Sequence, residues 1–202
     1  LLGEVLGTKD RVSNLNEFVD SMVSDLNKRT ANVLQRPSVY VGGLPYKTGS
    51  SGFLGTDVGF EVLRLINTES IVDNLGMQPG FYNVDFSYLL KAQPDYVFID
   101  EGNLDLVISQ FQQNKQEFCS LNAFKEGNVF GLLPYRWYGV NMTNEFLSAY
   151  YIGKVIYPDN FSDVDIISLA EKVYTEFLGV NIYPNYLKYA PGYTNVSGYF
   201  KC

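Results

Sequence analysis

Hydrophobic residues recur at intervals of three and four positions through residues 9–36, which is the spacing of one face of an α-helix. Thr8 can cap the start of this helix, and Pro37 stops it because proline lacks the amide hydrogen that continues a helix. At about 1.5 Å per residue the predicted helix is about 42 Å long. This length suits a connecting helix between two lobes, and it suits a core helix equally well. The recurring positions are Leu15, Phe18, Val19, Met22, Val23, Leu26 and Val33.

From residue 38 onward, short apolar runs alternate with segments of helical spacing. The runs predict strands at residues 39–43, 96–100 and 128–132. The helical segments predict helices at residues 57–66, 85–92, 104–118, 145–156 and 163–178, with a short element at 70–74. Strands that alternate with helices are joined by right-handed crossovers into a mainly parallel sheet. The sequence therefore predicts an α/β fold, a three-layer Rossmann-like lobe preceded by the long helix.

Composition narrows the functional classes. Hydrophobic residues make up 46% of the 202 and charged residues 18%, so the chain can bury a core. The net charge of −7 argues against a nucleic-acid surface, which needs clustered Lys and Arg. No apolar run approaches the roughly 20 residues that span a bilayer. Neither an initiator Met nor a signal peptide is present, so we expect a piece of a longer protein or a processed product.

The titratable residues narrow the chemistry further. The chain has no histidine, which excludes Ser-His-Asp hydrolysis, HExxH zinc sites and His-ligated haem within it. Cys119 and Cys202 are far apart and form no CxxC pair, and we expect both to be free thiols. Asp100 and Glu101 stand side by side at a predicted strand end. They could form an acid/base pair, but adjacent carboxylates more often cap the following helix.

A glycine-rich loop at residues 42–56 follows the first predicted strand. Ligands of a parallel α/β sheet bind in loops beyond the carboxyl ends of the strands, so this loop is a candidate site. It has neither GxGxxG nor GxxxxGK[ST], because Lys47 precedes the glycines, and this argues against a nucleotide. The glycines either serve turns with positive φ or support a ligand-facing loop in which Tyr46, Lys47 and Thr48 point outward.

A second candidate loop, residues 133–141, follows the third predicted strand and contains the only Trp of the chain. An Arg can donate a fork of hydrogen bonds to a carboxylate or catecholate, while Trp and Tyr pack on a flat ligand. Burial of the aromatic residues in the core is the alternative, but consecutive residues of a loop cannot all face one core. We therefore expect ligand contact from at least one of Arg136, Trp137 and Tyr138.

Six segments, in this order and spacing, resemble class III periplasmic binding proteins, the group that includes vitamin B12, ferric-siderophore and haem binders. The likeness covers roughly residues 1–190, and residues 149–161 are similar to the iron-complex branch. The segments are residues 2–7 (LGEVLG), 39–43 (VYVGG), 84–99 (VDFSYLLKAQPDYVFI), 124–130 (FKEGNVF), 134–138 (PYRWY) with Asn141, and 149–161 (AYYIGKVIYPDNF).

The resemblance implies two α/β lobes joined by a stiff helix, with the ligand in the cleft between them. Residues 1–36 would hold the end of a preceding helix and the interlobe helix. Residues 37–179 would form the C-terminal ligand-binding lobe, and residues 180–202 a Tyr-rich tail. The N-terminal lobe is not in this sequence. The implied protein is not an enzyme and needs no cofactor. It captures an iron complex (siderophore), haem or corrinoid outside the cytoplasm and delivers it to the permease of an ABC importer.

The resemblance also implies two sets of site residues. In the family, a surface Glu that docks onto the permease lies seven residues before the Pro of Pro-Asp. Ser87 occupies that position here, so Asp85, Glu61 or Glu69 would have to substitute. This lobe's half of the cleft would be lined by Tyr46, Lys47, Thr48, Phe81, Tyr82, Arg136, Trp137 and Tyr138.

Two other classes of function compete with a binding lobe. One is an enzyme on a Rossmann-like sheet that uses carboxylates and a nucleotide, against which the missing motifs and missing histidine argue. The other is a surface interaction domain that uses the Tyr-rich stretch between Tyr183 and Tyr199.

Overall fold

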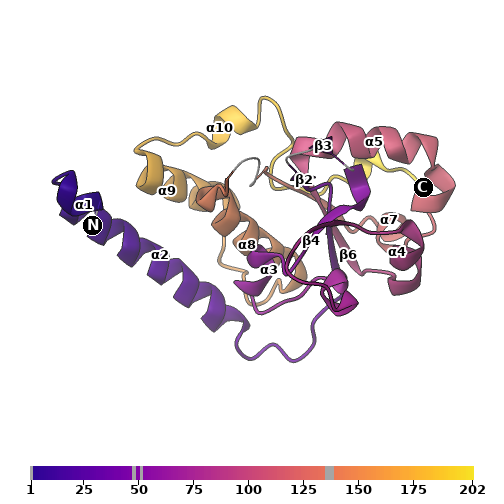
Figure 1. Ribbon diagram of the computed structural model, residues 1–202, viewed down its shortest axis with the longest axis horizontal. Helices are drawn as coiled ribbons and strands as arrows, with labels where there is room; N and C mark the ends of the chain where they lie inside the picture. The colour runs from indigo at the N-terminus through magenta and orange to yellow at the C-terminus, as the bar shows by residue number, and fades with distance from the viewer. Residues whose placement is uncertain (1, 47–48, 51, 135–138) are drawn as a thin grey trace.

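The chain folds around a short parallel sheet that separates two groups of helices (Figure 1). This computed structural model describes residues 2–46, 49–50, 52–134 and 139–202. The central sheet has the order β1 (Val39–Gly42), β6 (Tyr96–Asp100), β7 (Val129–Leu132), and both outer strands run parallel to β6. In register, Val41 lies opposite Phe98, and Phe98 lies opposite Phe130. The predicted α/β fold with a mainly parallel sheet is confirmed.

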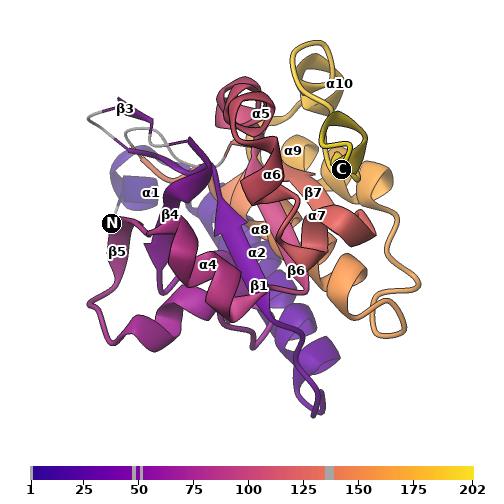
Figure 2. The same ribbon diagram turned by 90° about the vertical axis from the view of Figure 1, so that its right-hand side faces the viewer.

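Successive residues of the strands face opposite sides of the sheet, which gives the fold its three layers. Val41 and Phe98 belong to one buried hydrophobic cluster, whereas Tyr40 and Ile99 belong to another. Figures 1 and 2 show helices on both sides of β6. The first cluster packs against α2 (Lys9–Thr30), α3 (Glu61–Arg64), α8 (Met142–Ile156) and α9 (Ile166–Leu178). The second packs against α4 (Phe86–Ala92), α5 (Leu104–Gln113), α6 (Lys115–Phe118) and α7 (Asn122–Glu126).

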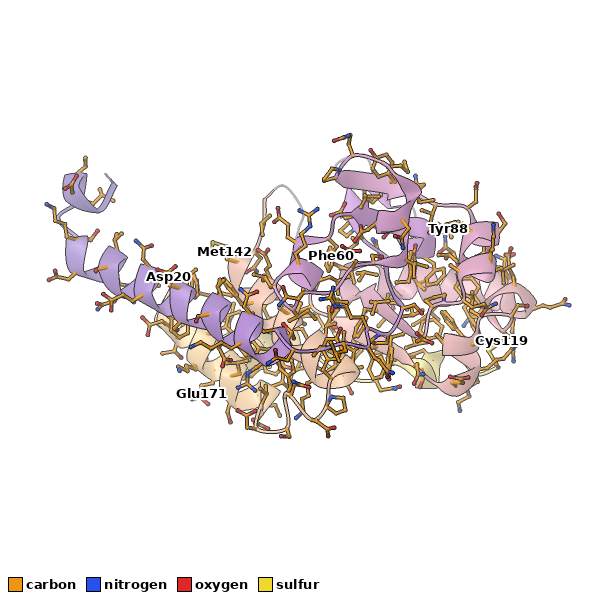
Figure 3. All side chains as sticks on the ribbon, turned by 90° about the horizontal axis from the view of Figure 1, so that it is seen from below. Asp20, Phe60, Tyr88, Cys119, Met142 and Glu171 are labelled. Carbon is orange, nitrogen blue, oxygen red and sulfur yellow. A yellow bond between two sulfur atoms is a disulfide. The ribbon has the colours of Figure 1, made fainter. Side chains whose placement is uncertain are left out.

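The long helix α2 follows the short α1 (Leu2–Val5) and ends at Thr30, earlier than the predicted Arg36. Asn160 donates a hydrogen bond to the Arg29 carbonyl at 2.7 Å, and the Val33 amide donates to the Thr30 carbonyl at 3.2 Å. These contacts satisfy the last carbonyls of the helix, so it ends there. The first half of α2 is largely exposed and projects from the sheet along α9, where Arg11 pairs with Glu176 (Figure 3).

Two antiparallel strand pairs flank the sheet, and neither was predicted. The first joins β2 (Pro45–Tyr46) to β3 (Gly49–Ser50), and the second joins β4 (Gly55–Val58) to β5 (Gly80–Asn83). The predicted helix at 57–66 is therefore wrong at its start, and only α3 remains of it. The buried Thr56 donates a hydrogen bond to the Val41 carbonyl at 2.7 Å, which ties β4 to β1.

Other element bounds differ from prediction for local reasons. The helix predicted at 104–118 is broken at Asn114, which leaves the helical conformation at φ −127° and ψ 35°. Helix α9 begins at Ile166 because the side chain of Asp165 caps it by accepting from the Ser168 amide. Helix α8 begins at Met142, behind the cap Asn141. Short 3₁₀ turns complete the fold: η1 (Gly52–Leu54), η2 (Ile71–Leu75), η3 (Glu101–Asn103) and η4 (Ser197–Tyr199).

The end of the chain is part of the lobe. After α10 (Tyr183–Tyr186), we call residues 187–202 the C-terminal segment. It pairs antiparallel with β7, because the Gly131 amide donates to Thr194 and the Val196 amide donates to Val129, both at 2.9 Å. This pairing covers the outer edge of the sheet. No helix in the described part of the chain is long and apolar enough to cross a membrane.

The expectation of two free thiols is wrong, because Cys119 and Cys202 form a disulfide with a Cα–Cα distance of 5.5 Å. Phe200 is buried two residues before the second cysteine. Its ring packs edge-on against Phe111 and Phe124, with centroid distances of 5.4 and 5.3 Å. Burial of this ring brings the end of the chain to the end of α6, where Cys119 lies. The cysteines are 83 positions apart in sequence, and this separation hides their proximity.

Candidate functional site

The candidate site is the edge of the sheet where β1, β6 and β7 all end. Because the three strands are parallel, Gly42, Asp100 and Leu132 lie at this one edge. Both candidate loops of the sequence leave from it, as predicted. Lys47 and Thr48 in the first loop, and residues 135–138 with Arg136, Trp137 and Tyr138 in the second, lie outside the described residues.

The start of the first loop is fixed against the end of β6. Gly43 adopts a positive φ of 75°, and a Cβ atom there would lie 3.2 Å from Ile99 and 3.3 Å from the Asp100 carbonyl. Asn103 donates a hydrogen bond to the Gly43 carbonyl at 2.6 Å. Glycine is needed at position 43 for both its conformation and its close approach to β6. Tyr46 follows in β2, which leads away from this fixed point.

Phe81 and Tyr82 are neighbours on β5 and are half-buried on different sides of it. Phe81 packs against the cluster that includes Val41, whereas Tyr82 packs against the cluster that includes Tyr40. A Cβ atom at Gly55 would lie 3.2 Å from the Phe81 ring, so Phe81 covers β4 near the start of the first loop. In register, Tyr82 lies opposite Thr56 and Phe81 opposite Asp57, so both residues lie beside the end of the first loop.

The second loop begins from a buried polar network that the sequence did not reveal. Asn144, which is buried in α8, donates to the carbonyl of Pro134 at 2.5 Å and accepts from the hydroxyl of Tyr174. The Tyr193 hydroxyl donates to the Asn144 carbonyl at 3.1 Å. Pro134 is the second residue of this loop, so Asn144 holds the point from which the loop departs. The high Tyr content was the only sequence signal of this network.

Asp100 and Glu101, the adjacent carboxylates at the end of β6, have different roles. Asp100 accepts from the Gly102 amide at 2.8 Å and so caps η3, which is the more common arrangement for such a pair. Glu101 is only 9% exposed and accepts from the Gly192 amide at 3.0 Å. Burial is the main reason that the pKa of Glu101 is raised to about 7; the Gly192 amide opposes this shift and nearby Asp100 adds to it.

A cavity of about 510 Å³ lies away from this edge, between α2, α8 and α9. Three of its charged side chains pair with one another: Arg29 lies 2.7 Å from Asp25 and 2.6 Å from Asp163. The Tyr150 hydroxyl also donates to Asp25 at 2.8 Å. We attribute this network to the joining of α2 to α8 and to the loop before α9, since the charged groups of Asp25, Arg29 and Asp163 already have partners.

The three candidate docking residues are all exposed. Asp85 precedes α4 as its cap residue, Glu61 is the first residue of α3, and Glu69 lies just before η2. Ser87, at the position of the family's docking Glu, is exposed on α4. Each of these positions is therefore accessible to a partner.

Comparison with known proteins identifies the family. The family model described as "Periplasmic binding protein" matches residues 1–135, and the chain belongs to this family. None of the curated proteins matches the sequence.

Solved structures with the same fold include the TroA-like periplasmic binding protein FepB from Veillonella parvula. It is 16% identical with a TM-score of 0.66, over 89% of this chain and 56% of that one. The molybdate periplasmic binding protein MolA of Haemophilus influenzae, bound to molybdate, is 20% identical (TM-score 0.68, 89% and 54%). Helicobacter pylori CeuE with Ni(II) bound is 14% identical (TM-score 0.63, 89% and 56%). The chain thus spans little more than half the length of these structures.

Proposed function

We propose that this chain is the C-terminal lobe of an extracytoplasmic substrate-binding protein that delivers its ligand to an ABC importer. The observation that carries the proposal is the match to the periplasmic binding protein family over residues 1–135. The parallel sheet supports it, since both candidate loops leave from the edge where α/β proteins bind ligands. The Cys119–Cys202 disulfide supports a location outside the cytoplasm, because disulfides persist in oxidising compartments.

The proposed ligand is an iron complex (siderophore), haem or a corrinoid. Such ligands are bulky, partly flat and partly anionic, and a sequence of Tyr, Arg, Trp and Tyr offers flat rings beside a forked donor. Similar structures carry other cargo, molybdate on MolA and Ni(II) on CeuE, so both ions belong in any test. The lining residues we propose are Tyr46, Lys47, Thr48, Phe81, Tyr82, Arg136, Trp137 and Tyr138.

The proposed permease contact uses an exposed carboxylate of this lobe. Asp85, Glu61 and Glu69 are exposed and differ in the element that carries them. A carboxylate in this role pairs with a cationic group on the permease, so its loss should slow transport without weakening ligand capture. Separate Asn or Gln substitutions at the three positions, compared in a transport assay, would identify the residue.

A thermal-shift screen of the longer protein that contains this lobe tests the proposal. The panel should include ferric siderophores, haem, cobalamin, molybdate, Ni(II), ATP and NAD. Stabilisation by one of the three chelate classes is the expected result, since a ligand that binds the folded state raises its melting temperature. Stabilisation only by molybdate or Ni(II) would overturn the ligand class while keeping the binding protein. Stabilisation only by a nucleotide would favour an enzyme.

A further inference from the structure

Glu101 connects the candidate edge of the sheet to the C-terminal segment. Its Oε2 atom accepts from the Gly192 amide at 3.0 Å, across 91 positions of sequence. Gly192 has a positive φ of 82°, and a Cβ atom there would lie 2.5 Å from Leu187 and 2.9 Å from the Tyr183 hydroxyl. This tight turn is what brings the Gly192 amide to the carboxyl group. The contact lies two residues before the pairing of Thr194 with β7.

The other carboxyl oxygen of Glu101 is enclosed without a donor. Among the described residues, Oε1 accepts no hydrogen bond and is shielded from solvent. It lies against Gly131, where a Cβ atom would come within 2.1 Å of it, and Val196 closes the same space. A protonated carboxyl group tolerates this enclosure, whereas a carboxylate loses solvation that Oε1 does not recover from the protein.

Within the described ranges, the titratable neighbours of Glu101 include no basic group that would stabilise its ionised form, and one of them, Asp100, makes its ionisation more costly. They come from the strand before it, from α5, α8 and α10 and from the C-terminal segment, and each is acidic or phenolic. The negative charge of Asp100 adds electrostatic repulsion to the cost of burying a second carboxylate. The phenol groups of Tyr151, Tyr183 and Tyr193 stay neutral because burial raises their pKa. The titratable neighbours are Asp100, Asp105, Tyr151, Tyr183, Tyr189, Tyr193 and Tyr199.

We propose that Glu101 is a proton-dependent latch that holds the C-terminal segment against the sheet when it is protonated and loosens the segment when it ionises. The direction of this pH dependence follows from the enclosure of Oε1, which favours the protonated carboxyl group. It agrees with the raised pKa of about 7. A carboxyl group whose pKa is raised in the closed state contributes stability below its ordinary pKa and loses it as the pH rises through the raised value. Opening lets the carboxylate reach water, and the proton passes to solvent. The device therefore acts between mildly acidic and neutral conditions.

Amide hydrogen exchange across the C-terminal segment of the oxidised protein tests the latch. The pKa of Glu101 should return from about 7 to 4.5 when the segment opens. The equilibrium constant for opening, obtained after correction for intrinsic exchange, should then rise about 70-fold between about pH 5 and about pH 8.5. The amides of Gly192 and Val196 report it. Glu101→Gln keeps an acceptor for Gly192 and removes the titration, so its exchange should not depend on pH. Glu117→Gln, an exposed carboxylate on α6, should behave as the wild type.

Three results would overturn the proposal. The first is wild-type protection in the segment that is the same at both pH values. The second is pH dependence that persists in Glu101→Gln. The third is an equal change in the core strands β1 and β6, which would indicate global unfolding. Because the disulfide stays closed throughout, the measurement reports the latch and not the release of the chain end.

Discussion

Asn144 satisfies polar groups from several elements at once, although it is one buried residue of α8. It binds the carbonyl of Pro134 and the hydroxyl of Tyr174, and its own carbonyl accepts from Tyr193. Side-chain networks of this kind are stable only when all members are satisfied, because an unpaired buried polar group loses its hydration without compensation. Removing the amide should therefore affect the whole network.

Asn144→Ala is expected to lower the free energy of unfolding by about 2–4 kcal/mol, since it leaves a buried hydroxyl and a buried carbonyl unpaired. Urea denaturation measures this directly. The control is Asn122→Ala, at an exposed position on α7, which should change stability by less than about 0.5 kcal/mol. A loss as small as that of the control would mean that water replaces the amide.

Trp137→Ala is expected to weaken ligand binding in the longer protein without unfolding it. When the indole ring is removed, a flat chelate that packed on it loses about 2–3 kcal/mol of binding free energy from apolar burial, which is about 30- to 150-fold in affinity. Titration calorimetry and the melting temperature of the ligand-free protein should be read together. Tyr189→Ala, at a 90% exposed position, is the matched control. A large fall in melting temperature with the Trp variant would make Trp137 a core residue, with a cavity cost of about 3–5 kcal/mol.

The roles of Asp100 and Glu101 differ in how far they could be predicted from the sequence. The pair Asp100-Glu101 marks a strand end, and capping by Asp100 follows from local spacing. The partner of Glu101 is an amide 91 positions away, and local spacing contains no information about such a contact. The raised pKa of Glu101 depends on its burial beneath the C-terminal segment. It could not be predicted from residue type.

At the scale of elements, the apolar runs predicted the three strands of the central sheet, whereas the two flanking strand pairs were missed. Strand β6 has a continuous apolar run because both of its faces are covered, and its predicted bounds are correct. Strands β4 and β5 have four residues each, include glycine, and pair with each other beside the main sheet. Their sequences lack the regular alternation that marks a strand, so β4 was assigned in part to a helix and β5 was missed.

The disulfide is the covalent counterpart of the pairing between the C-terminal segment and β7. Replacing both cysteines by serine should lower the free energy of unfolding by about 2–4 kcal/mol, because the cross-link closes a long loop in the unfolded chain. Urea denaturation of the oxidised wild type and of the Cys119→Ser/Cys202→Ser variant measures the difference. Wild type treated with a reductant should match the variant. Equal stability of all three would show that burial of Phe200 alone holds the chain end.

At the scale of the whole molecule, the arrangement of α2 explains why this lobe is half of a binding unit in our proposal. The first half of α2 meets the lobe through an Arg11–Glu176 ion pair at 2.8 Å and through Phe18, whose ring lies 6.1 Å from that of Phe177. An exposed ion pair contributes little stability, and Phe18 is only partly buried. Helix α2 is therefore held mainly by its second half, where Met22 and Leu26 are buried. The remaining surface of α2 is available to a second lobe.

The lobe alone is expected to bind the chelate at least about 100-fold more weakly than the longer protein. Binding sites for small molecules enclose most of the ligand surface, and one lobe can cover only one side of a ligand held in a cleft. Losing roughly half of the contacts removes about 3 kcal/mol or more, which corresponds to that factor. Circular dichroism should first show that the isolated lobe is folded, and calorimetry then compares the two dissociation constants. Equal affinity would place the whole site within residues 1–202, and the two-lobe cleft would then be wrong.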